Sequence, residues 1–174
     1  MIDSNDQAPI GYNPVPEMTF SLAAGLNWKG IDFSILLQGA ARSSIYLQQD
    51  IAWDNFWGNY YEEHIGRWTP ETAATATYPR FTKAATAAHP NYYKSDYWLK
   101  DSKYLRLKNI QLGYTIPRKL LKKFGVRSLR VYANAYNLFT WDNVKKVDPE
   151  SSNNSNGQFY PQQKVINFGI NLNF

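Results

Sequence analysis

Aromatic side chains gather in one irregular stretch of the chain, residues 43–100, and their flat faces are the groups in this sequence best suited to contact a ligand. The chain has 174 residues, 16% of them aromatic, and this stretch is interrupted by Pro70, Pro79 and Pro90. Aromatic rings stack on sugars or pack into a partner protein, and so long a loop is uncommon in a compact domain unless it is functional. The candidate contact residues are Trp53, Phe56, Trp57, Tyr60, Trp68, Tyr92 and Tyr93. The alternative is that these rings pack against one another and give the loop a small core of its own.

Metal and catalytic chemistry have little support among the polar residues. Glu62, Glu63 and His64 are adjacent, but adjacent residues rarely converge on one ion, and the closed spacings of zinc sites are absent. The acidic and Asn-rich stretch 142–156 offers oxygen ligands without the spacing of a calcium loop. The chain has no Cys, no serine in a nucleophile-elbow context and no Gly-rich phosphate loop. We therefore expect a protein that is not an enzyme and that has no metal site and no cofactor.

The net charge of +5 comes in part from one basic stretch of the chain. Its cations are Arg118, Lys119, Lys122, Lys123, Arg127 and Arg130. Nucleic-acid binding would require such a face to belong to a recognisable module, and the sequence has none. We expect a solvated turn here, and no nucleic-acid partner.

Alternating apolar and polar residues indicate the elements that must support the aromatic loop. At the end of the chain, every second residue is apolar, with Asn and Gly between: Ile166, Phe168, Ile170, Leu172 and Phe174. Because a strand turns successive side chains to opposite faces, one face of this strand is apolar and the other is polar. This pattern is typical of a strand that separates lipid from the wet interior of an outer-membrane barrel.

The same alternation predicts four further strands. They cover residues 18–28, 31–41, 104–116 and 128–140. Lys29 and Gly30 form a tight turn between the first two strands, which therefore make a hairpin. Leu105 and Leu107 are out of phase with the rest of their strand, so its start either contains a bulge or lies outside the lipid band. The mean hydropathy of −0.51 argues against a helical membrane protein.

The connections between these strands alternate in length, at about two, sixty, ten and twenty residues. Outer-membrane barrels have short periplasmic turns and long extracellular loops. We therefore expect three extracellular segments, the lead-in 1–17 and the loops 43–100 and 142–162. Between them lie the hairpin 18–41, the strand pair 104–140 with its periplasmic turn, and the closing strand 164–174.

Five strands cannot close a barrel, because the smallest barrels of this class need about eight. Each strand has roughly the 9–11 residues that cross a bilayer when tilted. An exported barrel also needs a signal peptide, and the start of this sequence has no such pattern. We therefore expect further strands before residue 1, in a longer parent protein.

Short motifs in a fixed order cover nearly the whole chain. They are WKGID at 28–32, QG at 38–39, RWTPE at 67–71, YPR at 78–80, YLRLKNI at 104–110, LGYTIP at 112–117, SLRVY at 128–132, NLFT at 137–140, DPE at 148–150 and FGINLNF at 168–174. With these motifs the chain resembles the carboxy-terminal part of SusC/RagA-type TonB-dependent outer-membrane transporters.

The resemblance implies an all-β fold, the last five strands of an antiparallel transmembrane barrel of about 22 strands with an internal plug. It implies import of glycan or peptide fragments across the outer membrane of a Gram-negative cell. The implied partners are outer-membrane lipid, a SusD-type surface lipoprotein, an oligosaccharide or peptide ligand, and the TonB complex, which acts through an amino-terminal part absent here. The residues Ile166, Phe168, Ile170, Leu172 and Phe174 resemble the signal that the outer-membrane assembly machinery recognises.

Two other interpretations remain open from the sequence. A soluble or surface-exposed β-sandwich could bind glycans through the aromatic loop, and it would cover both faces of its sheets with its own residues. A passive pore is the other alternative, and it would need no plug in the preceding sequence.

Overall fold

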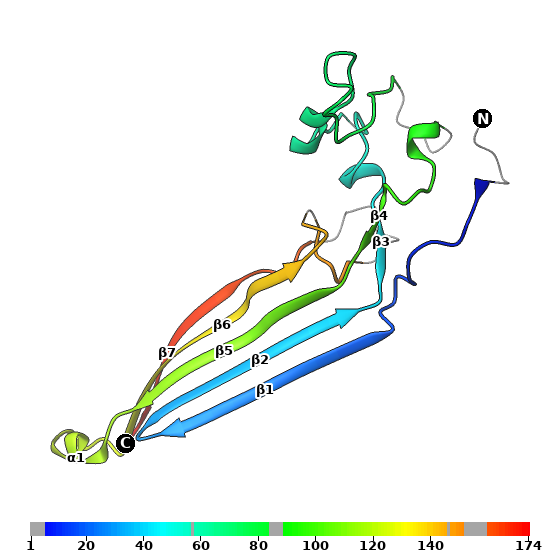
Figure 1. Ribbon diagram of the computed structural model, residues 1–174. Coiled ribbons are helices and arrows are strands. Elements are labelled where there is room, and N and C mark those ends of the chain that lie inside the picture. The colour runs from blue at the N-terminus through cyan, green and yellow to red at the C-terminus, as the bar shows by residue number, and fades with distance from the viewer. Residues whose placement is uncertain (1–5, 57, 84–88, 146, 152–159) are drawn as a thin grey trace. The chain divides into compact units, whose positions relative to one another are not determined.

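A computed structural model describes residues 6–56, 58–83, 89–145, 147–151 and 160–174 (Figure 1). The chain divides into two compact units. The first, here called the loop unit, consists of Met1–Pro16, Arg42–Ser102 and Asn143–Pro161. The second, the sheet unit, consists of Glu17–Ala41, Lys103–Asp142 and Gln162–Phe174.

The sheet unit is one antiparallel sheet of five strands in the order β1-β2-β5-β6-β7. The strands are β1 Met18–Trp28, β2 Ile31–Ala41, β5 Tyr104–Thr115, β6 Ser128–Asp142 and β7 Val165–Asn173. Figure 1 shows them lying side by side, with β1 at one edge and β7 at the other. The sheet is open, and its strands occupy the segments in which the sequence alternates.

A two-residue turn joins β1 to β2. Lys29 has φ 48° and Gly30 has φ 89°, and positive φ at both central residues is the geometry that matches the twist of a hairpin. A Cβ atom at Gly30 would also lie 2.7 Å from the carbonyl oxygen of Thr115. The turn therefore needs glycine for its backbone conformation and for its close approach to β5.

The phase change at the start of β5 is a bulge. Leu36 of β2 pairs with Asn109, whereas the next residue, Leu37, pairs with Leu107, so that Lys108 is an extra residue in β5. Because one inserted residue reverses the alternation, Leu107 returns to the face that carries Ile110. The structure thus contains the bulge that was one of the two possibilities that the sequence left open.

The β5–β6 pairing shifts at the same level of the sheet. Leu107 pairs with Phe139 and Asn109 with Tyr136, and Asn137 between them has φ 51°. Because of this irregularity, β5 and β6 both keep their apolar residues on one face in the part of the sheet that contains Leu107 and Phe139.

A short helical connection joins β5 to β6. It consists of α1 Arg118–Leu121 and the 3-10 turn η5 Lys122–Phe124, and it ends at Gly125, whose φ of 70° is the left-handed conformation of a helix C-cap. Within the described residues, the chain has no helix that is both long and apolar enough to cross a bilayer.

The loop unit has secondary structure that the alternation did not indicate. A two-stranded antiparallel sheet pairs β3 Ser44–Tyr46 with β4 Leu99–Asp101. Among the described residues between them lie three 3-10 helices, η2 Gln49–Ile51, η3 Glu62–Gly66 and η4 Pro90–Tyr92. The core of the unit consists of Ile45, Leu47, Ala52, Trp53, Tyr78, Tyr92, Trp98 and Val144.

Candidate functional site

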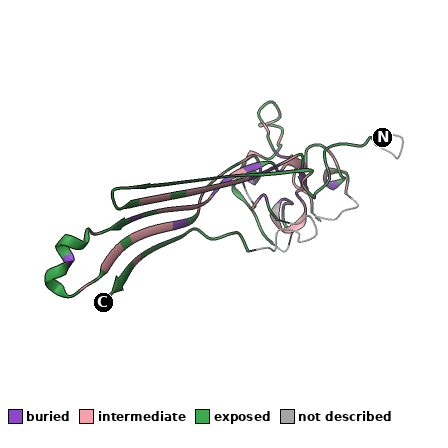
Figure 2. Ribbon diagram, turned by 90° about the horizontal axis from the view of Figure 1, so that it is seen from below, coloured by how far each residue is buried: buried purple, intermediate pink, exposed green. Residues whose placement is uncertain are grey.

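The apolar residues of β7 continue across the sheet as one apolar face. Ile166 pairs with Ala135 and Phe168 with Ala133. Further along these two rows lie Ile110 in the first, and Leu112 and Phe33 in the second. Most of the large side chains on this face are exposed: Phe20, Leu22, Leu26, Trp28, Leu112, Phe139, Trp141, Ile166, Phe168, Ile170, Leu172 and Phe174. Strand β7, which leads to the end marked C in Figure 2, is exposed along nearly its whole length.

The opposite face of the sheet is polar and is held together by side-chain hydrogen bonds. The Asn167 amide donates to the amide oxygen of Asn134 at 3.0 Å, and the Asn173 amide donates to the hydroxyl of Ser128 at 2.7 Å. Each bond joins β7 to β6. The two faces of β7 therefore differ in chemistry as the sequence predicts. The recognition of β7 by the outer-membrane assembly machinery stays a prediction.

A charged row crosses this polar face through two glycines. Asp32, Gly113, Tyr132 and Gly169 stand opposite one another on β2, β5, β6 and β7. The Arg130 guanidinium forms an ion pair with Asp32 and lies 4.8 Å from the centre of the Tyr132 ring. A Cβ atom at Gly113 would meet the ion pair, and one at Gly169 would meet the Tyr132 ring. Glycine at these two positions leaves room for larger side chains from the neighbouring strands.

In the loop unit, two of the seven candidate contact residues form the centre of the core. Trp53 is 3% exposed and Tyr92 is 2% exposed, and their ring centres are 4.7 Å apart. Phe56 packs edge-on against Trp53 at 5.8 Å. The alternative in which the rings pack together therefore describes these three residues. Trp57 lies outside the described residues.

The other three candidates reach the surface of the loop unit. Tyr60 is 57% exposed, Trp68 39% and Tyr93 41%. Trp68 is fixed by its backbone, whose N–H donates to the carbonyl of Tyr78 at 2.9 Å. A role of these three side chains in ligand or partner contact stays a prediction.

A buried carboxylate, Asp54, organises the aromatic core. It accepts a hydrogen bond from the Tyr92 hydroxyl and one from the backbone N–H of Thr82 at 3.0 Å. The Tyr78 hydroxyl lies beside it, accepts from the Asp54 backbone N–H at 3.0 Å and donates to the carbonyl of Ala52 at 2.8 Å. Because an unpaired buried carboxylate is costly, these donors make the core possible.

Burial and the Asp54 carboxylate both raise the pKa values of the Tyr78 and Tyr92 hydroxyls. Desolvation, followed by the neighbouring Asp54 carboxylate, raises the pKa of Tyr78 far above its ordinary value. Desolvation and the hydrogen bond to Asp54 raise the pKa of Tyr92 in the same direction. Both hydroxyls therefore stay protonated and keep their hydrogen bonds.

His64 has a structural role in the same core. Its Nδ1 accepts from the backbone N–H of Tyr61 at 3.0 Å, and its Nε2 faces the carbonyl of Ala52 at 3.2 Å, to which it donates. The ring also packs edge-on against Tyr78 at 4.5 Å. With both nitrogens engaged, His64 has no free lone pair for a metal, and the described part of the chain has no cluster of three or more His, Cys, Asp or Glu that could hold one.

Sequence reasoning missed Asp54, Tyr78 and the Asp32–Arg130 pair. Asp54 contacts residues 24 to 38 positions away, and Asp32 and Arg130 are 98 positions apart. No local pattern indicates such partners. The sequence did show that aromatic residues are abundant in the loop. That abundance was the basis of the alternative in which the rings pack against one another.

No family model matches the chain. Among curated proteins, TonB-dependent receptor P26 of Formosa agariphila is 30% identical over 190 residues, covering 99% of this chain and 18% of the relative. The TonB-dependent receptor SusC of Bacteroides thetaiotaomicron is 26% identical over 175 residues, covering 99% of this chain and 16% of the relative. The chain thus spans less than a fifth of the length of these relatives.

Solved structures share the fold. The RagAB peptide importer in the 'open-open' state superposes with a TM-score of 0.72 at 22% identity, covering 100% of this chain and 19% of that one. In the 'closed-closed' state the TM-score is 0.73 and the coverage 99% and 19%. These relatives are receptors and transporters rather than enzymes, and TonB-dependent receptors are outer-membrane proteins. The chain belongs to the TonB-dependent receptors of the SusC/RagA type, and its open sheet is a fragment of their β-barrel.

Proposed function

We propose that the chain forms barrel wall and surface loops in an outer-membrane transporter that imports glycan or peptide fragments and is energised through TonB. The observation that carries this proposal is the exposed apolar face of the five-stranded sheet. A face of this kind suits the hydrocarbon of a bilayer, whereas the polar face with its Asn pairs and its ion pair suits a wet interior.

A β-sandwich fits these faces poorly. It would need a second sheet packed on the apolar side, whereas Leu26, Leu112 and Ile170 on that side are exposed among the described residues. The second sheet of the chain has two strands of three residues each. Such a sheet is too small to cover five strands of nine to fifteen residues.

The alternating lengths of the connections support an orientation in which the short turns are periplasmic and the loop unit is extracellular. In that orientation Tyr60, Trp68 and Tyr93 are available to a ligand or to a SusD-type lipoprotein. Energy would reach the barrel from the TonB complex through a part of the parent protein outside this chain. Outer-membrane lipid and the assembly machinery would meet the face that carries Ile170.

Uptake by cells that lack the parent gene tests the transport proposal. Labelled oligosaccharides and labelled peptides are supplied separately, with and without an uncoupler of the proton-motive force. We expect one of the two pools to enter wild-type cells in an uncoupler-sensitive manner and to be excluded from the deletion strain. Equal uptake by both strains, or uptake that the uncoupler leaves unchanged, would contradict the proposal.

Substitution of exposed rings tests the contact residues. The double variant Trp68→Ala, Tyr93→Ala should reduce uptake or binding of the partner lipoprotein while leaving the amount of protein in the outer membrane unchanged. Tyr114→Ala is the matched control, because Tyr114 is similarly exposed but lies on the apolar face of the sheet. If the double variant behaves as the control does, the aromatic residues of the loop unit serve packing only.

A further inference from the structure

The connection between β5 and β6 is strongly basic. Arg118, Lys119, Lys122, Lys123 and Arg127 are all exposed, and none of them is paired with a carboxylate among the described residues. The sequence contains no Asp or Glu from residue 103 to residue 141. No acidic side chain between residues 103 and 141 therefore compensates the positive charge of the connection.

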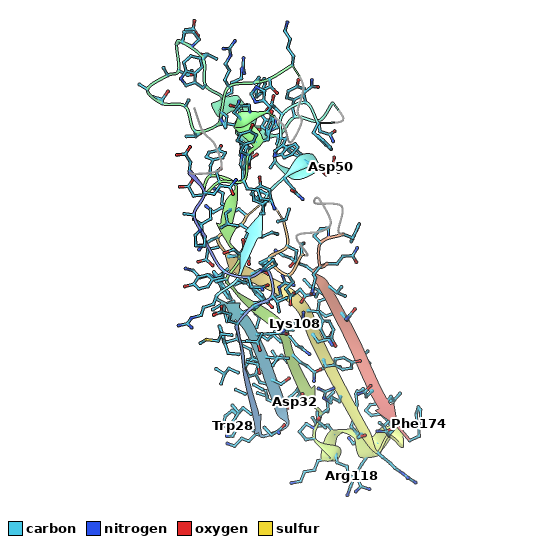
Figure 3. All side chains as sticks on the ribbon, turned by 90° about the vertical axis from the view of Figure 1, so that its right-hand side faces the viewer. Trp28, Asp32, Asp50, Lys108, Arg118 and Phe174 are labelled. Atoms are coloured by element: carbon cyan, nitrogen blue, oxygen red, sulfur yellow. The ribbon has the colours of Figure 1, made fainter. Side chains whose placement is uncertain are left out.

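Backbone hydrogen bonds hold this connection at one end of the sheet. The N–H of Thr115 donates to the carbonyl of Gly30 at 2.7 Å, and the N–H of Arg127 donates to the carbonyl of Asn173 at 2.8 Å. The β1–β2 turn and the end of β7 therefore lie beside it. Figure 3 shows Trp28, Arg118 and Phe174 together at this end of the five strands.

Large apolar side chains stand among the cations. Leu120 is 65% exposed and Phe124 is 76% exposed, one helical turn apart on the connection, whereas Leu121 is buried. Trp28, the last residue of β1, is exposed next to the adjacent turn, and the ammonium of Lys29 lies 4.9 Å from the centre of its ring. Cations mixed with Leu, Phe and Trp are typical of protein segments that lie in the interface between lipid and water.

We propose that this connection, residues 116–127, binds the anionic head groups of phospholipids in the membrane leaflet at which the short turns emerge. The five cations supply charge complementary to the phosphates, and Leu120 and Phe124 enter the boundary of the acyl chains. A solvated turn would gain nothing from exposing two such side chains. The inference rests on the proposed function, because it requires the sheet to stand in a membrane.

Lipid titration of the full-length parent protein in detergent tests this inference, with native mass spectrometry to count bound lipids. The variant Lys119→Gln, Lys122→Gln, Lys123→Gln is compared with the control Arg80→Gln, Lys83→Gln, Lys94→Gln, which removes three exposed cations from the loop unit. Each cation near an anionic surface contributes about a fivefold change in affinity. We expect the first variant, which loses three such cations, to bind phosphatidylglycerol about a hundredfold more weakly, and the control to bind it as the wild type does.

Further arms separate the possible results. Wild-type protein should prefer phosphatidylglycerol to phosphatidylcholine, and inorganic phosphate should not displace the lipid. The variant Leu120→Ser, Phe124→Ser should weaken binding of both lipids. Equal affinity of the wild type for the two lipids, or an unchanged affinity in the triple-Gln connection variant, would overturn the inference. Failure of the proposed function would be seen separately, as absence of the parent protein from the outer-membrane fraction.

Discussion

The guanidinium of Arg130 in β6 reaches across β5 to the carboxylate of Asp32 in β2, and its Nε lies 2.8 Å from Asp32 Oδ1. The two strands are not neighbours in the sheet. The pair passes over Gly113, where a Cβ atom would stand 2.5 Å from the Arg130 guanidinium and 2.5 Å from Asp32 Oδ1. A missing side chain on the middle strand therefore permits a contact that ties three strands together on the polar face.

Substituting Gly113→Ala should break this contact. Because the added methyl group meets only the ends of two flexible side chains, we expect a loss near the value of a partly exposed ion pair, about 0.5–1 kcal/mol. The double variant Asp32→Asn, Gly113→Ala should be no less stable than the worse single variant. The measurement is urea unfolding of the folded parent protein.

Gly25→Ala is the control for that experiment. A Cβ atom at Gly25 would lie 3.6 Å from its nearest neighbour, the carbonyl oxygen of Phe33, which is ordinary contact. Its effect on unfolding should be small. Fully additive losses for Asp32→Asn and Gly113→Ala would show that the glycine acts independently of the ion pair.

Substituting Tyr92→Phe should loosen the loop unit. The change removes the hydroxyl that donates to the buried Asp54 carboxylate, and a lost hydrogen bond to a charged group costs about 1.5–3 kcal/mol. Hydrogen exchange of the amides around Thr82 should accelerate while exchange in β5 and β6 stays unchanged. Tyr97→Phe is the control, because its hydroxyl donates to the neutral carbonyl of Thr77 at an exposed position; an equal acceleration in both variants would contradict the special role of Asp54.

Alkaline pH should destabilise the loop unit. Tyr78 and Tyr92 have folded-state pKa values raised above their ordinary value of 10.0. A raised folded pKa contributes stability that is fully present below the unfolded pKa, and that stability is lost as the pH rises from 10 through the folded value. Absorbance titration should therefore show phenolate of these two residues only when the loop unit opens. Their ionisation together with the exposed tyrosines, without unfolding, would contradict the burial argument.

The strands could be predicted from the sequence because apolar and polar side chains alternate with a period of two along consecutive residues. The β1–β2 hairpin follows from Lys29, Gly30 and the flanking alternation alone. The bulge at Lys108 was visible only as a phase change, since a second explanation, a strand end beyond the lipid, produces the same pattern. The register against β2 shows the bulge, and register is a relation between distant segments.

The interior of the loop unit could not be predicted in the same way. Trp53 and Trp68 are both tryptophans in an irregular segment, yet one is in the core and the other reaches the surface. What separates them is contact with residues far along the chain, such as the packing of the Trp53 ring against Tyr92. The sequence showed that a core or a contact surface was possible, and only the packing shows which residues lie in the core.

The facing of β7 is the central claim, and a pair of arginine substitutions tests it most directly. Ile166 points to the apolar face, in the row of Ala135, Ile110 and Ile35 at the middle of the sheet. Its neighbour Asn167 points to the polar face, opposite Asn134. On the lipid side an arginine costs up to about 2–4 kcal/mol at the bilayer midplane, whereas at Asn167 it stays in water. Assembly is measured as heat-modifiable parent protein in the outer-membrane fraction. We predict that Ile166→Arg abolishes assembly and that Asn167→Arg assembles at close to the wild-type level; equal tolerance of the two, or the reverse order, would contradict the account.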